Sequence, residues 1–339
     1  MKNILVTGGA GYIGSHTVVE LASAGYRPII IDNFSNSRKS VLEGIKKITG
    51  KDIICYEQDY QDQARLAKVI KKEKIDSVIH FAAFKAVGES VEKPLKYYKN
   101  NVVGLIKLLE IMEKAGVSSL VFSSSCTVYG EPDKLPLTEK SPIKPATSPY
   151  GATKQMGETI IADATAASKK LKSISLRYFN PIGAHPSARI GELPIGRPTI
   201  LVPFITQTAA GWHKKLTVNG NDYPTPDGTN IRDYIHVVDL AKAHVKALEH
   251  LSKQRTNYYD VFNIGTGKGN SVLEVIKTFE KLNRQKVPYR IGPKRAGDVI
   301  SSYAATDKAK RILGWESQLT LADSLKDAWR WQQTLKQNS

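Results

Sequence analysis

Cysteine and long apolar runs are scarce in this sequence, and each absence excludes a class of protein. Only two cysteines, Cys55 and Cys126, occur among the 339 residues, too few for a disulfide framework. No apolar run reaches about 18 residues, so no transmembrane helix is predicted. The opening residues, MKNILVTGGAGYIG, contain no signal-peptide apolar stretch before their glycines. We therefore expect a reduced, soluble, cytoplasmic protein with no membrane partner.

Acidic residues are also few relative to basic ones. Asp and Glu number 32 against 49 Lys and Arg, which leaves a formal net charge of +17. Such a surplus indicates an anionic partner: a nucleic acid, a membrane surface or a phosphorylated small molecule. The lysines are scattered, without zinc-finger spacing or an aromatic RNA-binding motif, so no nucleic-acid partner is expected. The seven histidines form no ligand-spaced cluster, and no metal site is predicted.

Short β-branched runs alternate with helical stretches through the first half of the chain. This pattern is typical of a parallel sheet covered on both faces, and right-handed crossovers then give an α/β, doubly wound (Rossmann) fold. Strands are expected at 4–7, 28–32, 53–56, 77–81, 119–123, 173–178 and 261–264. Helices are expected at 13–24, 37–48, 63–72, 94–115, 150–168, 237–251, 271–282 and 321–335.

A glycine-rich turn, GGAGYIG at 8–14, joins the first expected strand to the first expected helix. Glycines permit a tight turn and close approach of a pyrophosphate, and the helix N-terminus supplies free N–H groups. Asp32 ends the second strand, where a carboxylate binds a ribose diol and repels a 2′-phosphate. The combination favours NAD over NADP; Arg38 and Lys39 are the local feature that points the other way.

A second constellation combines Ser125, just past the fifth expected strand, with Tyr150 and Lys154 on one helix face. Lowering a tyrosine pKa from ~10 to ~7 needs about 4 kcal/mol of phenolate stabilisation. One cation about 6 Å away supplies roughly 3 kcal/mol at a dielectric of about 20. Lys154 is one such cation, and an oxidised nicotinamide is a second. Tyr150 is therefore predicted to remove a hydroxyl proton as hydride leaves the same carbon, with Ser125 bonded to the reacting oxygen.

The strand–helix alternation loosens after Asn180, where Gly and Pro become frequent. We predict an NAD-binding Rossmann domain over 1–180, to which 237–264 returns. A smaller C-terminal α/β substrate-binding domain is predicted from 181–236 and 265–339.

Several motifs resemble those of the UDP-glucose 4-epimerases, members of the extended short-chain dehydrogenase/reductase superfamily. The motifs are TGGAGYIGSH, SSSCTVYG, SPYGATK, RYFNPIGAHP, GNDYPTPDGTNIRDYIHV and Arg295-Ala296-Gly297-Asp298. The resemblance spans nearly the whole chain. The glycine turn and Tyr-x-x-x-Lys indicate only the superfamily, whereas RYFNPIGAHPS and GNDYPTPDGT-x-IRDYIHV are far more specific to the epimerases.

The resemblance implies a tightly held NAD that acts as a transient oxidant. Tyr150 would deprotonate the sugar 4-hydroxyl as hydride moves to NAD, and the 4-keto sugar would rotate before hydride returns to its other face. The implied NAD contacts are Gly8, Gly11, Tyr12, Ile13, Gly14, Asp32, Asn33, Asn36, Ser37, Asp59, Tyr60, Phe81, Ala82, Ala83, Lys85, Asn100, Tyr150, Lys154 and Phe179. The implied UDP-sugar contacts are Ser125, Tyr150, Asn180, Leu201, Thr217, Val218, Asn219, Arg232, Arg295, Asp298 and Ser302.

Two positions depart from the family pattern, and a third varies within the family with the range of sugars accepted. Ile200 replaces an asparagine that normally faces the substrate, and Asn219 replaces an aromatic residue found in several relatives. Ser302 stands where relatives limited to glucose and galactose carry a tyrosine, and relatives that accept N-acetylated sugars carry a small residue. We therefore expect UDP-GlcNAc and UDP-GalNAc to be accepted as well. The alternative is that Ser302 only fills a loop.

Three alternative functions, a dehydratase, a net reductase and a non-catalytic NAD sensor, do not match the residues of this sequence. Related nucleotide-sugar 4,6-dehydratases place an Asp-Glu pair after the serine, because eliminating water needs an extra acid and base; this chain has Cys126 and Thr127. A net reductase would need cofactor exchange and usually NADPH, which Asp32 disfavours. A non-catalytic NAD sensor would have lost Tyr150 and Lys154.

The family resemblance also implies a homodimer, formed through the helices expected at 94–115 and 150–168. The first of these carries Ile106, Leu108, Leu109 and Met112, although burial under the sheet explains part of that apolar character.

Overall fold

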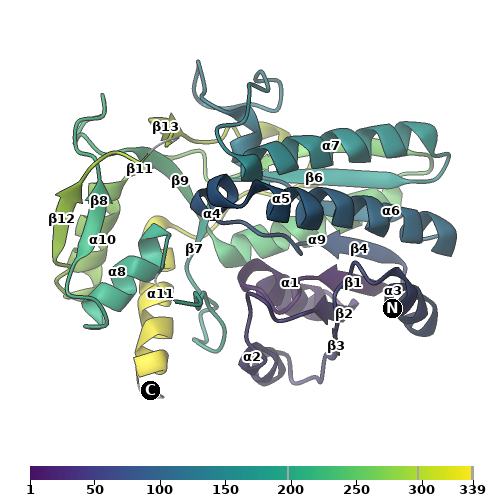
Figure 1. Cartoon of the computed structure of the whole chain (residues 1–339). Helices are drawn as coiled ribbons and strands as arrows, with labels where there is room; N and C mark the ends of the chain where they lie inside the picture. The colour runs from purple at the N-terminus through teal and green to yellow at the C-terminus, as the bar shows by residue number, and fades with distance from the viewer. Residues whose placement is uncertain (197, 296–297, 337–339) are drawn as a thin grey trace.

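A seven-stranded parallel sheet forms the larger part of the molecule (Figure 1). The computed structural model describes residues 1–196, 198–295 and 298–336. In spatial order the strands are β10 (Tyr258–Ile264), β6 (Lys172–Tyr178), β5 (Ser119–Ser123), β4 (Ser77–His80), β1 (Asn3–Thr7), β2 (Arg27–Asp32) and β3 (Ile54–Glu57). The order reverses between β1 and β4, so the predicted doubly wound fold is confirmed.

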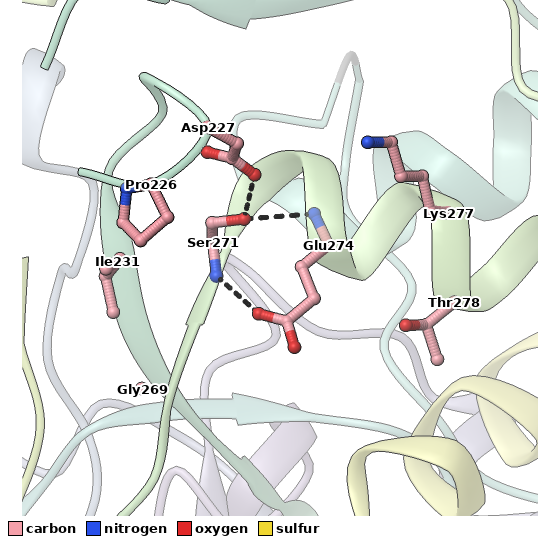
Figure 2. Close-up of a pocket in the computed structure, with 8 residues that line it drawn as sticks. All are labelled: Pro226, Asp227, Ile231, Gly269, Ser271, Glu274, Lys277 and Thr278. Atoms are coloured by element: carbon pink, nitrogen blue, oxygen red, sulfur yellow. Dashed lines mark hydrogen bonds between the residues drawn. The ribbon is translucent and has the colours of Figure 1, made fainter.

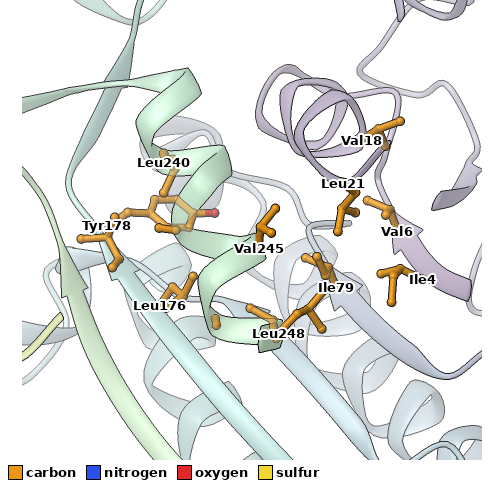
Figure 3. Close-up of a cluster of buried hydrophobic side chains, with 14 of the residues drawn as sticks. Ile4, Val6, Val18, Leu21, Ile79, Leu176, Tyr178, Leu240, Val245 and Leu248 are labelled. Carbon is orange, nitrogen blue, oxygen red and sulfur yellow. The ribbon is translucent and has the colours of Figure 1, made fainter. Parts of the chain in front are cut away.

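Alternate residues of β1 enter different hydrophobic cores, as a two-residue strand period requires. Ile4 and Val6 pack on one face with Val18 of α1 (Tyr12–Ser23) and Leu248 of α9 (Val237–Lys253), as Figure 3 shows. Leu5 points to the other face, where α3 (Gln63–Glu73), α6 (Gly104–Ala115) and α7 (Pro149–Ala167) contribute buried residues. Burial on both faces explains why the central strands β1, β2, β4 and β5 are largely apolar.

The long helix expected at 94–115 is interrupted. α5 (Pro94–Tyr97) passes into a π-helical turn, Tyr98–Val103, before α6 begins. The short α4 (Val87–Glu92), which was not predicted, precedes it. A π turn inside a helix changes which side chains share a face. The single 3.6-residue period assumed for this stretch is therefore wrong at 98–103.

A second group of elements lies at one side of the sheet, on the left in Figure 1. β9 (Ile231–His236) pairs with β7 (Asn180–Ile182), β11 (Gly269–Ser271) and β13 (Ser301–Ser302), and β8 (Leu216–Asn219) pairs with β12 (Tyr289–Gly292). α8 (Leu201–Ala209), α10 (Val272–Asn283) and α11 (Leu321–Lys336) complete the group, which has its own core. The remaining helix is α2 (Ser40–Thr49), beside α1.

α8 corrects the expectation of few helical periods between 181 and 230. Its sequence, LVPFITQTA, has a mainly apolar first half followed by Thr206, Gln207 and Thr208, and it carries Pro203 in the first turn, where proline is tolerated. Because 202–208 are all buried, these polar residues do not mark a solvent-facing side of the helix.

A capping box fixes the start of α10 (Figure 2). Ser271 Oγ accepts from the Glu274 backbone N–H at 3.0 Å, and the Glu274 carboxylate accepts from the Ser271 N–H at 3.2 Å. The Ser271 hydroxyl donates in turn to Asp227. This reciprocal arrangement satisfies N–H groups that a helix start leaves unpaired.

The division into two domains remains a prediction. β10 lies in the seven-stranded sheet beside β6, while α10 and α11, which follow it in the chain, belong to the second group.

In the described part of the chain, no helix is both long and apolar enough to cross a membrane.

Candidate active site

The site residues predicted from the sequence lie largely in segments that follow the carboxyl ends of the sheet strands, where open α/β sheets bind ligands. The segments after β1, β2, β3, β4 and β5 hold 8–14, 32–37, 59–60, 81–85 and Ser125. Asn100 lies in the π turn, Tyr150 and Lys154 on α7, and Phe179 and Asn180 at the step from β6 to β7. Leu201 begins α8, 217–219 lie in β8, Arg232 in β9, Arg295 and Asp298 between β12 and β13, and Ser302 in β13.

The glycine turn between β1 and α1 leaves no room for side chains. A Cβ at Gly14 would lie 2.3 Å from the Gly8 carbonyl oxygen, and one at Gly8 would lie 2.9 Å from the Ala82 nitrogen. Gly8 also has a positive φ of 71°. α1 begins at this turn with no side-chain cap and no acidic residue in its first turn. Its N-terminal amides and positive potential therefore suit a pyrophosphate.

Asp32 joins the glycine turn to the loop after β2. Its carboxylate is nearly buried and accepts from the Ala10 N–H at 3.0 Å, the Phe34 N–H at 2.9 Å and the Ser37 hydroxyl at 2.9 Å. Phe34 has a positive φ of 55°, a strained conformation for a bulky residue. These contacts hold the carboxylate beside the helix N-terminus, the place that a dinucleotide ribose requires.

A surface pocket brings together three of the predicted cofactor residues. Asn33, Asp59 and Asn100 line it, together with Phe84 and Lys99. They come from the loops after β2 and β3 and from the π turn. This convergence of distant segments fits the adenosine end of NAD. The pocket drawn in Figure 2, at the start of α10, contains none of the predicted site residues.

Three predicted ligand contacts have side chains that belong to the core. Tyr60, Phe179 and Val218 are each no more than 5% exposed. The Tyr60 hydroxyl donates to the Asn100 carbonyl oxygen at 2.8 Å, and its ring packs so closely on Gly104 that a Cβ there would lie 2.2 Å from the hydroxyl oxygen. All three side chains pack in hydrophobic clusters of the core.

The three predicted catalytic residues lie together. Lys154 is buried, its Nζ donates to the Ser123 carbonyl oxygen at 2.6 Å, and it lies 5.9 Å from the centre of the Tyr150 ring. The Ser125 side chain lies close enough to Tyr150 to lower its pKa. Ser125 Oγ also accepts from the Thr127 N–H at 3.3 Å, which caps a short 3-10 turn, Cys126–Tyr129.

Burial changes the electrostatics expected of this group. Desolvation raises the pKa of Tyr150 to about 12, partly offset by its hydrogen bond with Ser125. Desolvation also lowers the pKa of Lys154 to about 7, against the opposing charge of Glu158. The dry surroundings therefore penalise the charged form of each of these two groups. Lys154 alone does not bring the pKa of Tyr150 to about 7. The positive charge of an oxidised nicotinamide is therefore essential for Tyr150 to act as a base near neutral pH.

Lys85 has an acidic partner that sequence reasoning missed. Its Nζ lies 3.1 Å from Glu192 Oε1, and the backbone carbonyl of Glu192 accepts from Trp331 Nε1 at 3.0 Å. The Tyr12 hydroxyl donates to the carbonyl oxygen of Gly183, a residue distant in the chain, at 2.7 Å. The 107 residues between Lys85 and Glu192 explain why no local pattern indicated the pair.

Two predicted substrate residues form an ion pair. Arg232 Nη2 lies 3.0 Å from Asp298 Oδ1, and Asn230 Nδ2 donates to Asp298 Oδ2 at 3.1 Å. The Arg232 side chain is 12% exposed, and its Nη1 also donates to the Ile231 carbonyl oxygen at 2.8 Å. Arg295 is exposed, and Ala296 and Gly297 of its motif lie outside the described residues.

Ser302 is nearly buried and contacts Cys126. The two side chains share a hydrogen bond, which opposes the rise that burial causes in the pKa of the Cys126 thiol. The charge of Arg232 and the neighbouring Ser125 side chain also lower the pKa of the Cys126 thiol. Cys126 therefore lies close to both Ser302 and Ser125.

Comparison with known proteins places this geometry in a family. A family model described as GDP-mannose 4,6 dehydratase matches residues 5–328. UDP-glucose 4-epimerase from Bacillus subtilis is 54% identical over 97% of this chain and 96% of its own length. The mouse UDP-glucose 4-epimerase is 50% identical over 100% of this chain and 98% of its own.

Solved structures agree. UDP-glucose 4-epimerase from Stenotrophomonas maltophila, with bound NAD and formylated UDP-arabinopyranose, matches with a TM-score of 0.97 and 48% identity over the whole of both chains. The Bifidobacterium longum enzyme, in complex with NAD+ and UDP, matches with a TM-score of 0.95 and 46% identity over 98% of both. Cys126 and Thr127 occupy the slot where a dehydratase would carry its acidic pair. The chain therefore belongs to the UDP-glucose 4-epimerases, within the extended short-chain dehydrogenase/reductase superfamily.

Proposed function

We propose that this chain is an NAD-dependent epimerase that interconverts UDP-glucose and UDP-galactose by inverting carbon 4 of the sugar. The observation that carries the proposal is the meeting of Tyr150, Lys154 and Ser125 at the sheet edge that also holds the glycine turn and Asp32. Bound NAD supplies the hydride acceptor and, once reduced, the hydride donor.

The protein's own residues handle the proton and the orientation. Tyr150 takes the proton of the sugar 4-hydroxyl and returns it after inversion. Ser125 holds the reacting oxygen through its hydroxyl, which lies close to Tyr150. Lys154 stabilises the phenolate from beneath the ring. General acid–base catalysis of this kind contributes about 10²- to 10⁴-fold in rate.

The UDP portion is assigned to residues outside the catalytic group. Arg232 and Arg295 contact the phosphates, Asp298 the ribose and 217–219 the uracil. Support comes from the half-buried Arg232 side chain and its replaceable partner Asp298. Paired donors of a guanidinium match phosphate geometry better than a lysine does.

Purified protein incubated with UDP-galactose, without added NAD, tests the activity. We expect UDP-glucose to form without accumulation of NADH, because the hydride returns to the sugar. The Tyr150→Phe variant should retain NAD and lose about 10²- to 10⁴-fold in rate. No epimer from the wild-type protein, or near-normal turnover by Tyr150→Phe, would overturn the proposal.

Acceptance of UDP-GlcNAc and UDP-GalNAc is a further part of the proposal. Support comes from the small side chains of Ser302 and Cys126, because a tyrosine at 302 would be far bulkier than the serine. Turnover of UDP-glucose without any turnover of UDP-GlcNAc would disprove this part.

We also propose that the enzyme acts in the cytoplasm as a homodimer, through the helices α4 to α7. Several large apolar side chains are exposed there: Val91, Leu95, Val103, Ile106 and Met156. Apolar exposure gathered on adjacent helices is typical of a protein interface. A monomer in sedimentation at micromolar concentration would contradict the dimer.

A further inference from the structure

A row of serines follows β5, and two of them are held from successive turns of α7. Lys154 Nζ donates to the Ser123 carbonyl oxygen at 2.6 Å. One turn further along, Glu158 Oε1 accepts from the Ser124 hydroxyl at 2.5 Å. Ser125, which faces the reacting sugar oxygen, comes next. Because Lys154 and Glu158 are four residues apart, they share one face of the helix.

Glu158 is itself anchored in a buried ion pair. Arg177 of β6 donates from Nε to Oε1 at 2.9 Å and from Nη2 to Oε2 at 2.5 Å. Arg177 Nη1 also donates to the Tyr129 hydroxyl at 3.1 Å, which donates to Asn263 Oδ1 at 2.6 Å. Glu158 and Arg177 are 8% and 5% exposed. The carboxylate is therefore fixed in place by β6, and through Tyr129 and Asn263 by β10.

The groups that face Lys154 include few charges. The Phe122 ring lies 4.9 Å from Nζ and the Tyr150 ring 5.9 Å. His80 of β4 is neutral at physiological pH, because desolvation lowers its pKa to about 3. Glu158 is the acidic group whose charge raises the pKa of Lys154 against desolvation.

We propose that Glu158 is a positioning residue for catalysis: it keeps Lys154 protonated and ties the serine row to α7. This inference rests on the proposed epimerase function and deepens it. A buried ion pair contributes little net stability compared with apolar packing, so a role in the site accounts better for this carboxylate than a role in folding alone. Glu158 acts through Lys154 and Ser124 and does not touch the sugar.

The size of the effect follows from the spacing. Two unit charges about 6 Å apart, the separation of neighbouring side chains on one helix face, shift a pKa by about two units at a dielectric of about 20. The cationic form of Lys154 is present below its pKa and lost above it. Removing the Glu158 charge lowers the pKa of Lys154. The loss of activity on the alkaline side should therefore begin at a lower pH than in the wild-type enzyme.

The experiment is a pH profile of kcat for the NAD-loaded Glu158→Gln enzyme, which keeps an oxygen for Ser124 but loses the charge. We expect the alkaline limb to move about one to two pH units downward, with KM for UDP-galactose changed less than about threefold. Ser124→Ala is the matched control, because it removes the hydrogen bond and leaves the charge. Its kcat should fall without movement of the limb.

The double variant Glu158→Gln/Arg177→Gln repeats the test without an unpaired buried arginine and should shift the limb in the same direction by a smaller amount, because loss of the Arg177 cation raises the Lys154 pKa. An unchanged limb in the folded, NAD-loaded variants would overturn the role of Glu158. Wild-type protein measured alongside separates the two claims: an inactive wild type contradicts the proposed function, whereas an active wild type with an unchanged variant profile contradicts only this inference.

Discussion

Replacing Lys154 with methionine tests how the tyrosine becomes a base. The ammonium lies 5.9 Å from the centre of the Tyr150 ring, and two charges at that distance interact by about 3 kcal/mol at a dielectric of about 20. That energy corresponds to about two pKa units. Burial raises the pKa of Tyr150 to about 12 in the protein alone. When NAD binds, this pKa should fall less in the variant without the Lys154 cation than in the wild-type enzyme. We expect kcat to fall about 100-fold near neutral pH.

The sign of the pH dependence distinguishes this explanation from a purely structural one. The phenolate exists above the tyrosine pKa and disappears as pH falls, so the loss in Lys154→Met should shrink about tenfold for each pH unit gained. Conversion of UDP-galactose, measured by chromatography of the nucleotide sugars between about pH 6 and 9, gives the profile. Lys154→Arg keeps the charge and should retain most of the pH profile. A loss in Lys154→Met that is equal at every pH would refute the reasoning, and would mean that the lysine acts only by holding the Ser123 carbonyl.

Three further changes probe other parts of the molecule. Gly14→Ala places a Cβ 2.3 Å from the Gly8 oxygen, so the melting temperature should fall by the equivalent of about 1–3 kcal/mol and co-purified NAD should be lost. Gly88→Ala, with no atom within 4 Å of its Cβ, is the control. Equal effects of the two substitutions would contradict the explanation by crowding. Ser302→Tyr should abolish turnover of UDP-GlcNAc and leave that of UDP-glucose within about threefold, because the ring fills the space beside Cys126; loss of both activities in kinetic assays would show that 302 is not a size filter. Leu95→Glu puts a charge on a side chain that is 80% exposed and should yield a monomer in sedimentation, whereas a dimer would locate the interface elsewhere.

Local features carried the sequence-based prediction of the site. The glycine turn, the acid that ends β2 and the Tyr-x-x-x-Lys spacing each depend on a short stretch of chain, so their place in the fold follows once the strand–helix alternation is read. Family resemblance added the substrate residues, yet it did not indicate that the side chains of Tyr60, Phe179 and Val218 pack in the core.

What the sequence alone determined is therefore the doubly wound sheet and the identity of the residues at its carboxyl edge, because helical and strand periods and turn glycines are local signals. The tertiary structure decided which distant side chains meet. Glu192 reaches Lys85, Asp298 reaches Arg232 and Arg177 reaches Glu158 only because separate strands and loops converge. Burial also decided the electrostatics: the cost of removing a charge from water depends on everything packed around it, and no spacing along the chain encodes that cost.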